Sequence, residues 1–235
     1  MDINLSGLAG ATVVFDLDGT LVESAPDLVA TLNVLLAQEG ASPLPLSEAR
    51  NMIGQGARAL LAKGFAAEGI VVEEPRLSAL FERFIAHSRE HIADASYVVP
   101  GVEAALDMLQ GAGATLAVCT NKRTDLSLSL LSELGLIDRF AAIIGPDSAG
   151  AAKPDPHHLL YAIEHAGGRA DRAVMVGDSS SDALAAQAAG VPLVLVTFGY
   201  TPVPVTELGA DVLIDHFDEL TAACARLSQA WGTVA

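Results

Sequence analysis

The feature that most constrains the fold of this chain is a series of short segments that are almost continuously apolar. These segments lie at residues 11–15, 114–119, 140–144, 173–176, 193–197 and 212–214. Apolar runs of strand length are typical of parallel sheets that are covered on both faces. Helix-like stretches follow from residue 100 onward, at 102–110, 123–134, 156–166, 182–189 and 217–227. The alternation predicts an α/β fold with a doubly wound, Rossmann-like parallel sheet.

The first two apolar segments are separated by an unusually long interval. Asp16 and Thr120 are 104 positions apart, whereas a strand–helix–strand crossover needs about 30 residues. The interval contains helical patterns at 25–38, 46–52, 57–67 and 76–93, which Pro and Gly separate. We therefore expect residues 22–97 to form an inserted all-helical cap domain. Residues 1–21 and 98–235 are then expected to form the α/β core.

Composition excludes several classes of protein. The chain carries 13 Lys and Arg against 29 Asp and Glu, and its net charge of −16 repels nucleic-acid backbones. Its mean hydropathy is +0.41, yet no apolar run approaches the roughly 18–20 residues of a membrane span. The first residues lack the basic segment of a secretory signal. We therefore expect a cytoplasmic monomer or homodimer that binds neither nucleic acid nor membrane.

Acidic residues follow two of the apolar segments. Asp16 and Asp18 come after the first, and Asp178 follows the fourth, with Asp182 four residues further on. Ligands of open α/β sheets bind at the carboxyl ends of the strands, so three or four of these carboxylates are expected to converge. Carboxylates so close together cannot all stay ionised unless a cation is present. A site whose ligands are all oxygens favours Mg²⁺. The alternative is that these residues belong to turns, or that Asp182 merely begins a helix.

Two further segments offer complementary groups. Thr120 and Asn121 place a hydroxyl and an amide at the end of the second apolar segment. Lys153 precedes Pro154 and Pro156, which stiffen the loop before a helix. A lysine fixed near an acidic pocket is a candidate partner for phosphate or for a nucleophile. The alternative is an ordinary surface lysine.

Together these four segments resemble the signature motifs of the haloacid dehalogenase superfamily. Asp-x-Asp-Gly-Thr-Leu-Val at 16–22 is similar to motif one, and Gly-Asp-x-x-x-Asp at 177–182 is similar to motif four. Thr120 and Lys153 are similar to motifs two and three. The motifs occur in order across residues 11–190, so the resemblance covers most of the chain. It implies that the helical insertion is a cap that closes over the site.

The resemblance implies a role for each motif residue. Asp16 is expected to be the nucleophile that forms an aspartyl-phosphate. Asp18 is expected to protonate the leaving oxygen and then to deprotonate the attacking water. Thr120, the backbone amide of Asn121 and Lys153 are expected to bind the phosphoryl group.

The resemblance also implies Mg²⁺ as the cofactor. Asp16, the backbone carbonyl of Asp18 and Asp178 are expected to hold the ion, with Asp182 in an outer position. Dehalogenases of the superfamily lack an acid at the position of Asp18, because a halide needs no proton. Its presence favours an oxygen leaving group.

Several activities of the superfamily are compatible with these motifs. The leading hypothesis is a phosphomonoester hydrolase that acts on a small phosphorylated metabolite. The alternatives are a phosphomutase similar to β-phosphoglucomutase, and a pyrophosphatase or nucleotidase. A non-catalytic binding protein is disfavoured because Asp16, Asp18 and Asp178 are all present.

Within the insertion, residues 50–57 resemble the cap loop of bacterial phosphoglycolate phosphatases. The resemblance makes 2-phosphoglycolate the leading candidate substrate. Gly54, Gln55 and Gly56 are expected to let the backbone approach it, and Arg50 to pair with a carboxylate or phosphate. The alternative is a simple turn between helices, in which the glycines end a helix.

Other noticeable residues have a plainer interpretation. His157 and His158 begin a helix and are expected to be solvated or to cap it. Cys119 is expected to be a buried strand residue and not a nucleophile. Glu23 and Ser24, at the start of the insertion, are expected to edge the pocket.

Overall fold

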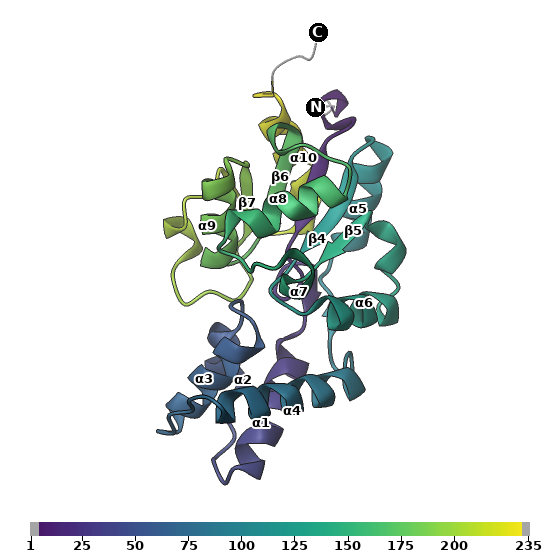
Figure 1. Cartoon of the computed structure of the whole chain (residues 1–235). Helices are drawn as coiled ribbons and strands as arrows, with labels where there is room; N and C mark the ends of the chain where they lie inside the picture. The colour runs from purple at the N-terminus through teal and green to yellow at the C-terminus, as the bar shows by residue number, and fades with distance from the viewer. Residues whose placement is uncertain (1–4, 232–235) are drawn as a thin grey trace.

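Strand β1 (Thr12–Phe15) lies in the middle of a parallel sheet in the computed structural model, which describes residues 5–231 (Figure 1). The six strands of this sheet have the order β5-β4-β1-β6-β7-β8. The other five are β4 (Thr115–Cys119), β5 (Ala142–Ile144), β6 (Ala173–Gly177), β7 (Leu193–Val196) and β8 (Val212–Ile214). Each predicted apolar segment forms one of these strands, which confirms the doubly wound α/β fold.

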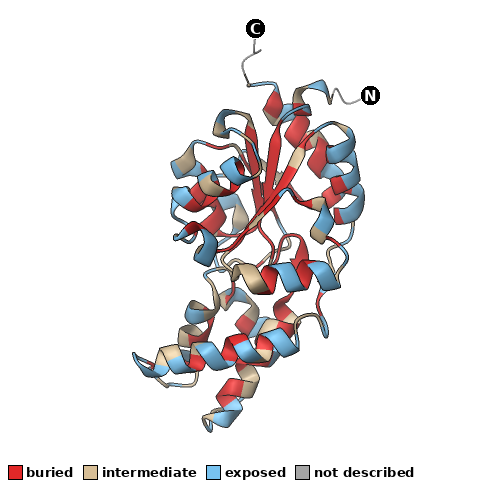
Figure 2. Cartoon of the chain, turned by 45° about the vertical axis from the view of Figure 1, so that its right-hand side comes forward, coloured by how far each residue is buried: buried red, intermediate tan, exposed pale blue. Residues whose placement is uncertain are grey.

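Helices cover both faces of the sheet, and this explains why the strands are continuously apolar. Neighbouring residues point to opposite faces of a strand, so Val13 and Val14 belong to different hydrophobic clusters. Figure 2 shows buried strands between helices whose outer surfaces are exposed. Helices α5 (Val102–Gly111), α6 (Thr124–Glu133) and α10 (Leu220–Ser228) pack on one face, and α8 (Pro156–His165) and α9 (Ser180–Ala189) on the other.

Most of the interval between β1 and β4 folds into a helical cap with its own apolar core. The cap consists of helices α1 (Ala25–Gln38), α2 (Leu46–Ala49), α3 (Ala57–Ala67) and α4 (Arg76–Glu90). Leu32, Phe65 and Phe84 are buried in its hydrophobic cluster. The predicted all-helical insertion is therefore confirmed.

Two short strands that the sequence did not predict join the cap to the sheet. Strand β2 (Val22–Glu23) pairs antiparallel with β3 (Tyr97–Val98). This pair lies at the boundaries that we expected at residues 22 and 97, and the division into two domains at these positions stays a prediction. The remaining elements are α7 (Pro146–Ala149) and the 3₁₀ turns Ser6–Leu8, Arg50–Met52, Ile137–Arg139, Ala170–Arg172, Val205–Glu207 and Phe217–Glu219.

The topology brings three strand ends together beneath the cap. Phe15 is in register with Val118 of β4 on one side and with Val176 of β6 on the other. From β1 the chain passes outward through β4 and β5, then returns to β6 on the opposite side of β1. Such a reversal of strand order leaves a crevice at the carboxyl ends, where ligands bind. None of the helices in residues 5–231 has the length and apolar character that a membrane crossing requires.

Candidate active site

Three buried carboxylates meet at the carboxyl ends of β1 and β6. One oxygen each of Asp16, Asp178 and Asp182 can be chosen so that all lie within 4.8 Å of one another. Asp16 follows β1 directly, Asp178 follows β6, and Asp182 lies in the first turn of α9. The convergence expected from the strand-end positions is therefore present.

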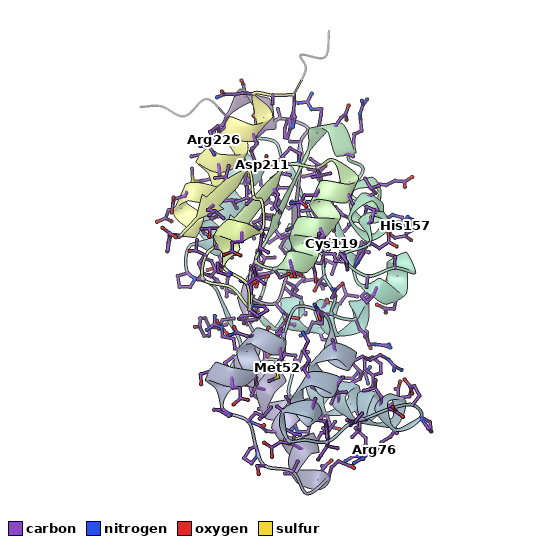
Figure 3. The ribbon with its side chains drawn as sticks, turned by 90° about the vertical axis from the view of Figure 1, so that its left-hand side faces the viewer. Met52, Arg76, Cys119, His157, Asp211 and Arg226 are labelled. Atoms are coloured by element: carbon purple, nitrogen blue, oxygen red, sulfur yellow. The ribbon has the colours of Figure 1, made fainter. Side chains whose placement is uncertain are left out.

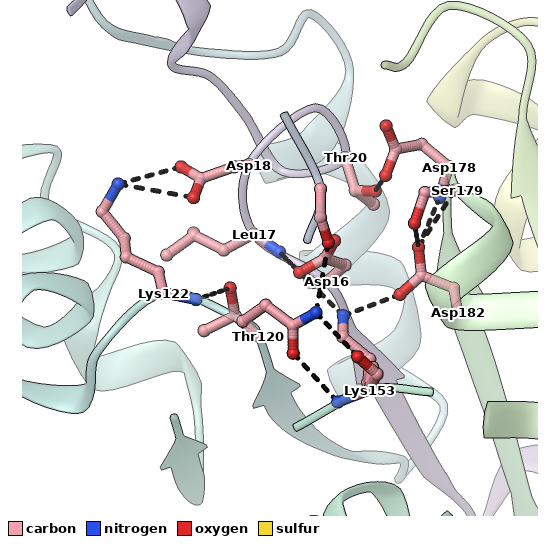
Figure 4. A network of polar contacts seen from close by, with 12 residues as sticks. Asp16, Leu17, Asp18, Thr20, Thr120, Lys122, Lys153, Asp178, Ser179 and Asp182 are labelled. Atoms are coloured by element: carbon pink, nitrogen blue, oxygen red, sulfur yellow. Dashed lines mark hydrogen bonds and ion pairs between the residues drawn. The ribbon is translucent and has the colours of Figure 1, made fainter. Parts of the chain in front are cut away.

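A single buried lysine accompanies these carboxylates (Figure 4). Lys153 Nζ lies 2.9 Å from Asp16 Oδ1 and 2.6 Å from Asp182 Oδ1, and its side chain is only 1% exposed. The structure therefore excludes the alternative of a surface lysine. The two oxygens of Asp16 differ. Oδ1 contacts Lys153 and also accepts a hydrogen bond from the backbone N–H of Leu17, whereas Oδ2 accepts none from the residues that the structure describes.

The charges of this cluster do not balance. Three carboxylates face one ammonium, and burial raises the pKa of both Asp16 and Asp178 above the usual range, with Asp182 adding to the effect. Burial alone would lower the pKa of Lys153, but the nearby Asp16 and Asp182 raise it, so the lysine stays charged. When all three carboxylates are ionised, they exceed the lysine by two negative charges, which are carried by oxygens alone and fit a hard divalent cation.

Asp182 has its oxygens engaged on both sides. Oδ1 accepts from Lys153 Nζ at 2.6 Å, while Oδ2 accepts from the backbone N–H groups of Asp178 and Ser179 and from the Ser179 hydroxyl. It therefore begins the helix, as the plainer alternative held, and also orients Lys153. Whether it acts on a metal from an outer position stays a prediction.

Asp178 is held by groups from two other loops. Its Oδ1 accepts from the Thr20 hydroxyl at 3.4 Å, and its Oδ2 accepts the backbone N–H of Tyr200. Gly19 has a φ of +88° and passes so close that an added Cβ would lie 2.6 Å from Asp178 Oδ2. A glycine is therefore required beside this carboxylate.

The carboxylate of Asp18 does not join the cluster. Its Oδ1 accepts from the Ser24 hydroxyl and lies 3.1 Å from Lys122 Nζ. Figure 4 shows the side chain of Asp18 turned away from Asp178 and Asp182, toward Lys122. This separates the Asp18 carboxylate from the three that are grouped together, and its role in proton transfer stays a prediction.

Thr120 and Asn121 lie at the end of β4, beside the cluster. Thr120 is buried, and its hydroxyl accepts the backbone N–H of Lys122 at 3.2 Å. The Asn121 side chain bonds the backbone of Lys153 in both directions and donates to the carbonyl of Gly54 at 3.1 Å. Asn121 thus ties together the β4 end, the Lys153 loop and the cap.

A cavity of about 210 Å³ extends from these residues into the cap. Asp16, Asp18 and Thr120 form its core end. Its cap end is mostly apolar and is lined by Leu28, Ile53, Leu60, Phe81, Phe84 and Ile85.

The cap loop at 54–56 reaches this cavity, but Arg50 does not. Gly54, Gln55 and Gly56 line the cavity, and a Cβ added at Gly56 would lie 3.2 Å from the carbonyl oxygen of Asn121. Arg50 instead donates to Glu23 at 2.8 Å and to the Phe198 carbonyl at 3.0 Å. In this conformation Arg50 therefore does not lie where it could contact a substrate in the cavity, contrary to the expectation.

One expectation outside the motifs is wrong. His158 is completely buried, although it was expected to be solvated or capping, whereas the adjacent His157 is exposed at the surface (Figure 3). The imidazole of His158 contacts the Ile144 carbonyl, and burial lowers its pKa to about 4. Cys119 is buried as expected, and burial raises its pKa to about 12, so it is a poor nucleophile.

Comparison with known proteins identifies the family. Residues 13–196 match the model of the haloacid dehalogenase-like hydrolases, and this span contains every carboxylate of the cluster. The chain belongs to the haloacid dehalogenase-like hydrolase family. The resemblance drawn from the motifs is thereby confirmed, and the family's cap corresponds to helices α1–α4.

Relatives within the family match nearly the whole chain. A phosphoglycolate phosphatase of Caulobacter vibrioides is 53% identical over 223 residues, which cover 95% of this chain and 94% of the relative. A phosphoglycolate phosphatase of Agrobacterium fabrum is 48% identical, with 89% of this chain and 90% of the relative covered. Among solved structures, a predicted phosphoglycolate phosphatase from Haemophilus somnus 129pt has a TM-score of 0.82 at 28% identity, covering 91% of this chain and 96% of its own.

Two residues of this hydrolase site were missed at the level of sequence. Lys122 contacts Asp18, and Tyr200 holds Asp178 through its backbone and Glu23 through its hydroxyl. Lys122 lies two residues after Thr120, and Tyr200 follows the end of β7. Examining every strand end for polar residues, including the strand next to β6, would have indicated both.

Proposed function

We propose that this chain is a Mg²⁺-dependent phosphomonoester hydrolase that converts 2-phosphoglycolate to glycolate and phosphate. The observation that carries the reaction is the buried cluster of three carboxylates and Lys153 at the centre of the sheet edge. The identity of 53% to a phosphoglycolate phosphatase over nearly the full length supports the substrate. The limited size of the cavity, about 210 Å³, supports a small substrate.

The first half of the reaction transfers the phosphoryl group to the protein. Oδ2 of Asp16 attacks phosphorus, because Oδ1 is held by Lys153 and Leu17. The bond from phosphorus to the ester oxygen breaks, and the protonated carboxyl of Asp18 gives its proton to the departing glycolate oxygen. An aspartyl-phosphate on Asp16 remains.

The second half releases phosphate. A water molecule gives a proton to the carboxylate of Asp18 and attacks phosphorus, and the bond to Asp16 breaks. Thr120, the Asn121 backbone amide and Lys153 hold the phosphoryl oxygens in both halves. Lys153 is fixed for this task by Asp182 at 2.6 Å.

The metal would be held by Asp16, the backbone carbonyl of Asp18 and Asp178, with Asp182 in an outer position. Bound there, Mg²⁺ would supply positive charge that stabilises the negative phosphoryl group in the transition state. Two observations support this fit. The cluster has a buried excess of negative charge, and within residues 5–231 the three grouped side chains offer only oxygen atoms as ligands.

A panel of phosphate esters tests the proposal. Phosphate release would be measured with 2-phosphoglycolate, hexose phosphates, pyrophosphate and nucleoside monophosphates, in Mg²⁺ and in EDTA. We expect the highest kcat/KM for 2-phosphoglycolate and no turnover in EDTA. A flat profile contradicts the substrate, and isomerised sugar phosphate without phosphate release would indicate a phosphomutase.

A pair of variants tests the nucleophile. Asp16→Asn is expected to abolish turnover while it preserves the fold. Asp171→Asn changes an exposed aspartate that pairs with Arg169, and is expected to keep full activity. Appreciable Mg²⁺-dependent hydrolysis by Asp16→Asn would overturn the assignment.

A further inference from the structure

The proposed substrate carries a second anionic group, and the cavity must provide a partner for it. Among the lining residues that the structure describes, the cations are Arg58, Lys122 and Arg123. The far wall is apolar, with Leu28, Phe84 and Ile85 among its residues. A carboxylate that loses its hydration against an apolar wall needs a compensating partner, and a cation offsets its charge as well as its lost hydrogen bonds.

The two arginines are engaged with acidic residues near solvent. Arg58 donates to Glu74 at 2.6 Å and stacks over the Phe81 ring, and its side chain is 47% exposed. Arg123 donates to Asp125 at 3.0 Å and is 37% exposed. Exposed charges with their own counterions are weak partners for a substrate.

Lys122 is different in both burial and partner. Its side chain is 7% exposed, and its Nζ lies 3.1 Å and 3.4 Å from the two oxygens of Asp18. An ammonium group has three N–H donors, and within residues 5–231 Asp18 is its acceptor. A donor therefore remains for a ligand in a site of low dielectric, where charge–charge attraction is stronger than in water.

The place of Lys122 suits the geometry of a short hydroxy-acid ester. A general acid lies roughly 2.6–3.2 Å from the oxygen that it protonates, and Lys122 Nζ is 3.1 Å from Asp18. The ammonium is therefore within about two hydrogen-bond lengths of the ester oxygen. In 2-phosphoglycolate the carboxylate carbon is two bonds from that oxygen, so both contacts can be made at once.

We propose that Lys122 binds the carboxylate of the substrate and thereby selects phosphate esters of short 2-hydroxy acids. This inference rests on the proposed function and extends it to a specificity-determining residue. It also explains why the cap contributes apolar side chains at the far wall: the charge of the leaving group is matched from the core side.

Substrate pairs that differ only in charge test the proposal. Wild type, Lys122→Met and Lys122→Arg would be assayed with 2-phosphoglycolate and with 2-phosphoglycolamide, in which a neutral amide replaces the carboxylate while the phosphate is kept, at saturating Mg²⁺. The readout is the ratio of kcat/KM for the acid to kcat/KM for the amide. Lys122→Met is expected to lower this ratio by about 10- to 100-fold, and Lys122→Arg to lower it less, because the charge is kept.

Controls separate recognition from structural damage. Loss of the contact with Asp18 lowers turnover of both substrates and leaves the ratio unchanged, so a structural role does not mimic the expected result. Arg123→Met removes another cation of the cavity wall and is expected to keep the wild-type ratio. Lys122→Gln, which retains a donor toward Asp18, provides the same readout if the Met variant does not fold.

The outcomes distinguish this inference from the proposed function. A wild-type enzyme that prefers the acid, together with a Lys122→Met variant that keeps the full preference, would overturn the role of Lys122 alone. A wild-type enzyme that hydrolyses acid and amide equally well would likewise overturn recognition of the carboxylate, whereas a wild-type enzyme that hydrolyses neither would overturn the proposed function.

Discussion

The two ends of the cavity differ in how their polar atoms are satisfied. At the core end, the carboxylates of Asp16 and Asp182 share the ammonium of Lys153, and the remaining oxygen of Asp182 accepts from fixed donors. At the cap end, Phe84 and its neighbours form an apolar wall, and Ser88 Oγ has no hydrogen-bond partner within the described residues. The core end is specified by charge and the cap end by shape.

This difference separates reaction from selection. A transferred phosphoryl group needs fixed charge and little else, and such a site tolerates no missing partner because each group is buried. An apolar wall tolerates changes in shape more readily, at a cost in packing. Variants at the core end should therefore change turnover and cation dependence, whereas variants at the cap end should change stability and substrate preference.

The largest effect is expected from Asp178→Asn. Without a cation, the wild-type cluster holds an excess of negative charge, and the variant removes one charge. We expect the variant to have a higher melting temperature than wild type in EDTA, to gain little from Mg²⁺, and to release phosphate only at the background rate. Wild type is expected to gain about 3 kcal/mol when Mg²⁺ is at 100 times its Kd. Calorimetry with and without Mg²⁺ measures all of these stabilities.

The pH dependence sharpens the same test. Burial raises the pKa of Asp178 above its usual 3.8, so its contribution to folding is fully present below pH 3.8 and is lost as the pH rises through the folded-state pKa. In EDTA, wild-type stability should fall over this range more than that of Asp178→Asn. An equal Mg²⁺-dependent gain in both proteins would contradict the assignment of Asp178 to the cation site. Asp171→Asn, at an exposed position, is the control.

The next largest effect is expected at the cap end, from Phe84→Ala. Phe84 is 1% exposed and lies both in the cap core and in the cavity wall. Its truncation should lower the free energy of unfolding by about 3–5 kcal/mol and raise KM for 2-phosphoglycolate, while Mg²⁺ dependence stays as in wild type. Leu109→Ala, in the sheet core, should cost about 2–5 kcal/mol without a change in KM. A changed Mg²⁺ requirement in Phe84→Ala would show that the two ends are not separable.

A smaller effect is expected where the two ends are joined, from Tyr200→Phe. The buried hydroxyl of Tyr200 accepts the backbone N–H groups of Ser24 and Ala25 and donates to Glu23 at 2.7 Å. Its loss leaves two backbone donors at the start of the cap without that partner, at a cost of about 1–3 kcal/mol. Mg²⁺ dependence should persist, because Asp178 is held by the backbone N–H of Tyr200. Tyr97→Phe, on an exposed ring, should have no measurable effect on stability.

The contrast between the ends also explains what could be predicted from sequence. Asp16, Thr120 and Asp178 follow apolar segments, and adjacent parallel strands place their carboxyl ends together whatever the intervening chain does. The direction of a side chain depends on distant partners that leave no local pattern. The sequence predicts that Arg50 contacts the substrate, but its guanidinium instead donates to Glu23 and to the Phe198 carbonyl.

The same limit applies to burial within helices. His157 and His158 are adjacent residues of the same type. His157 faces solvent, whereas His158 is buried and its ring contacts the carbonyl of Ile144 in β5. Only the packing of α8 against the sheet decides which is buried. The position of Lys122 after the end of β4 could have indicated it, but its contact with Asp18, 104 positions earlier in the chain, could not be predicted locally.

The smallest effect is expected from Ser88→Ala. Ser88 is 5% exposed and lines the cavity, and its hydroxyl is among the buried polar atoms without a partner in residues 5–231. Replacing it with a methyl group should leave stability unchanged or raise it by up to about 1 kcal/mol, with kcat/KM for 2-phosphoglycolate unaltered. The matched serine at the core end, Ser179, donates to Asp182 at 2.7 Å, so Ser179→Ala should lower stability by about 1–3 kcal/mol. If Ser88→Ala instead lowered kcat/KM, the hydroxyl would have to bind substrate, and the cap end would act through hydrogen bonds as well as shape.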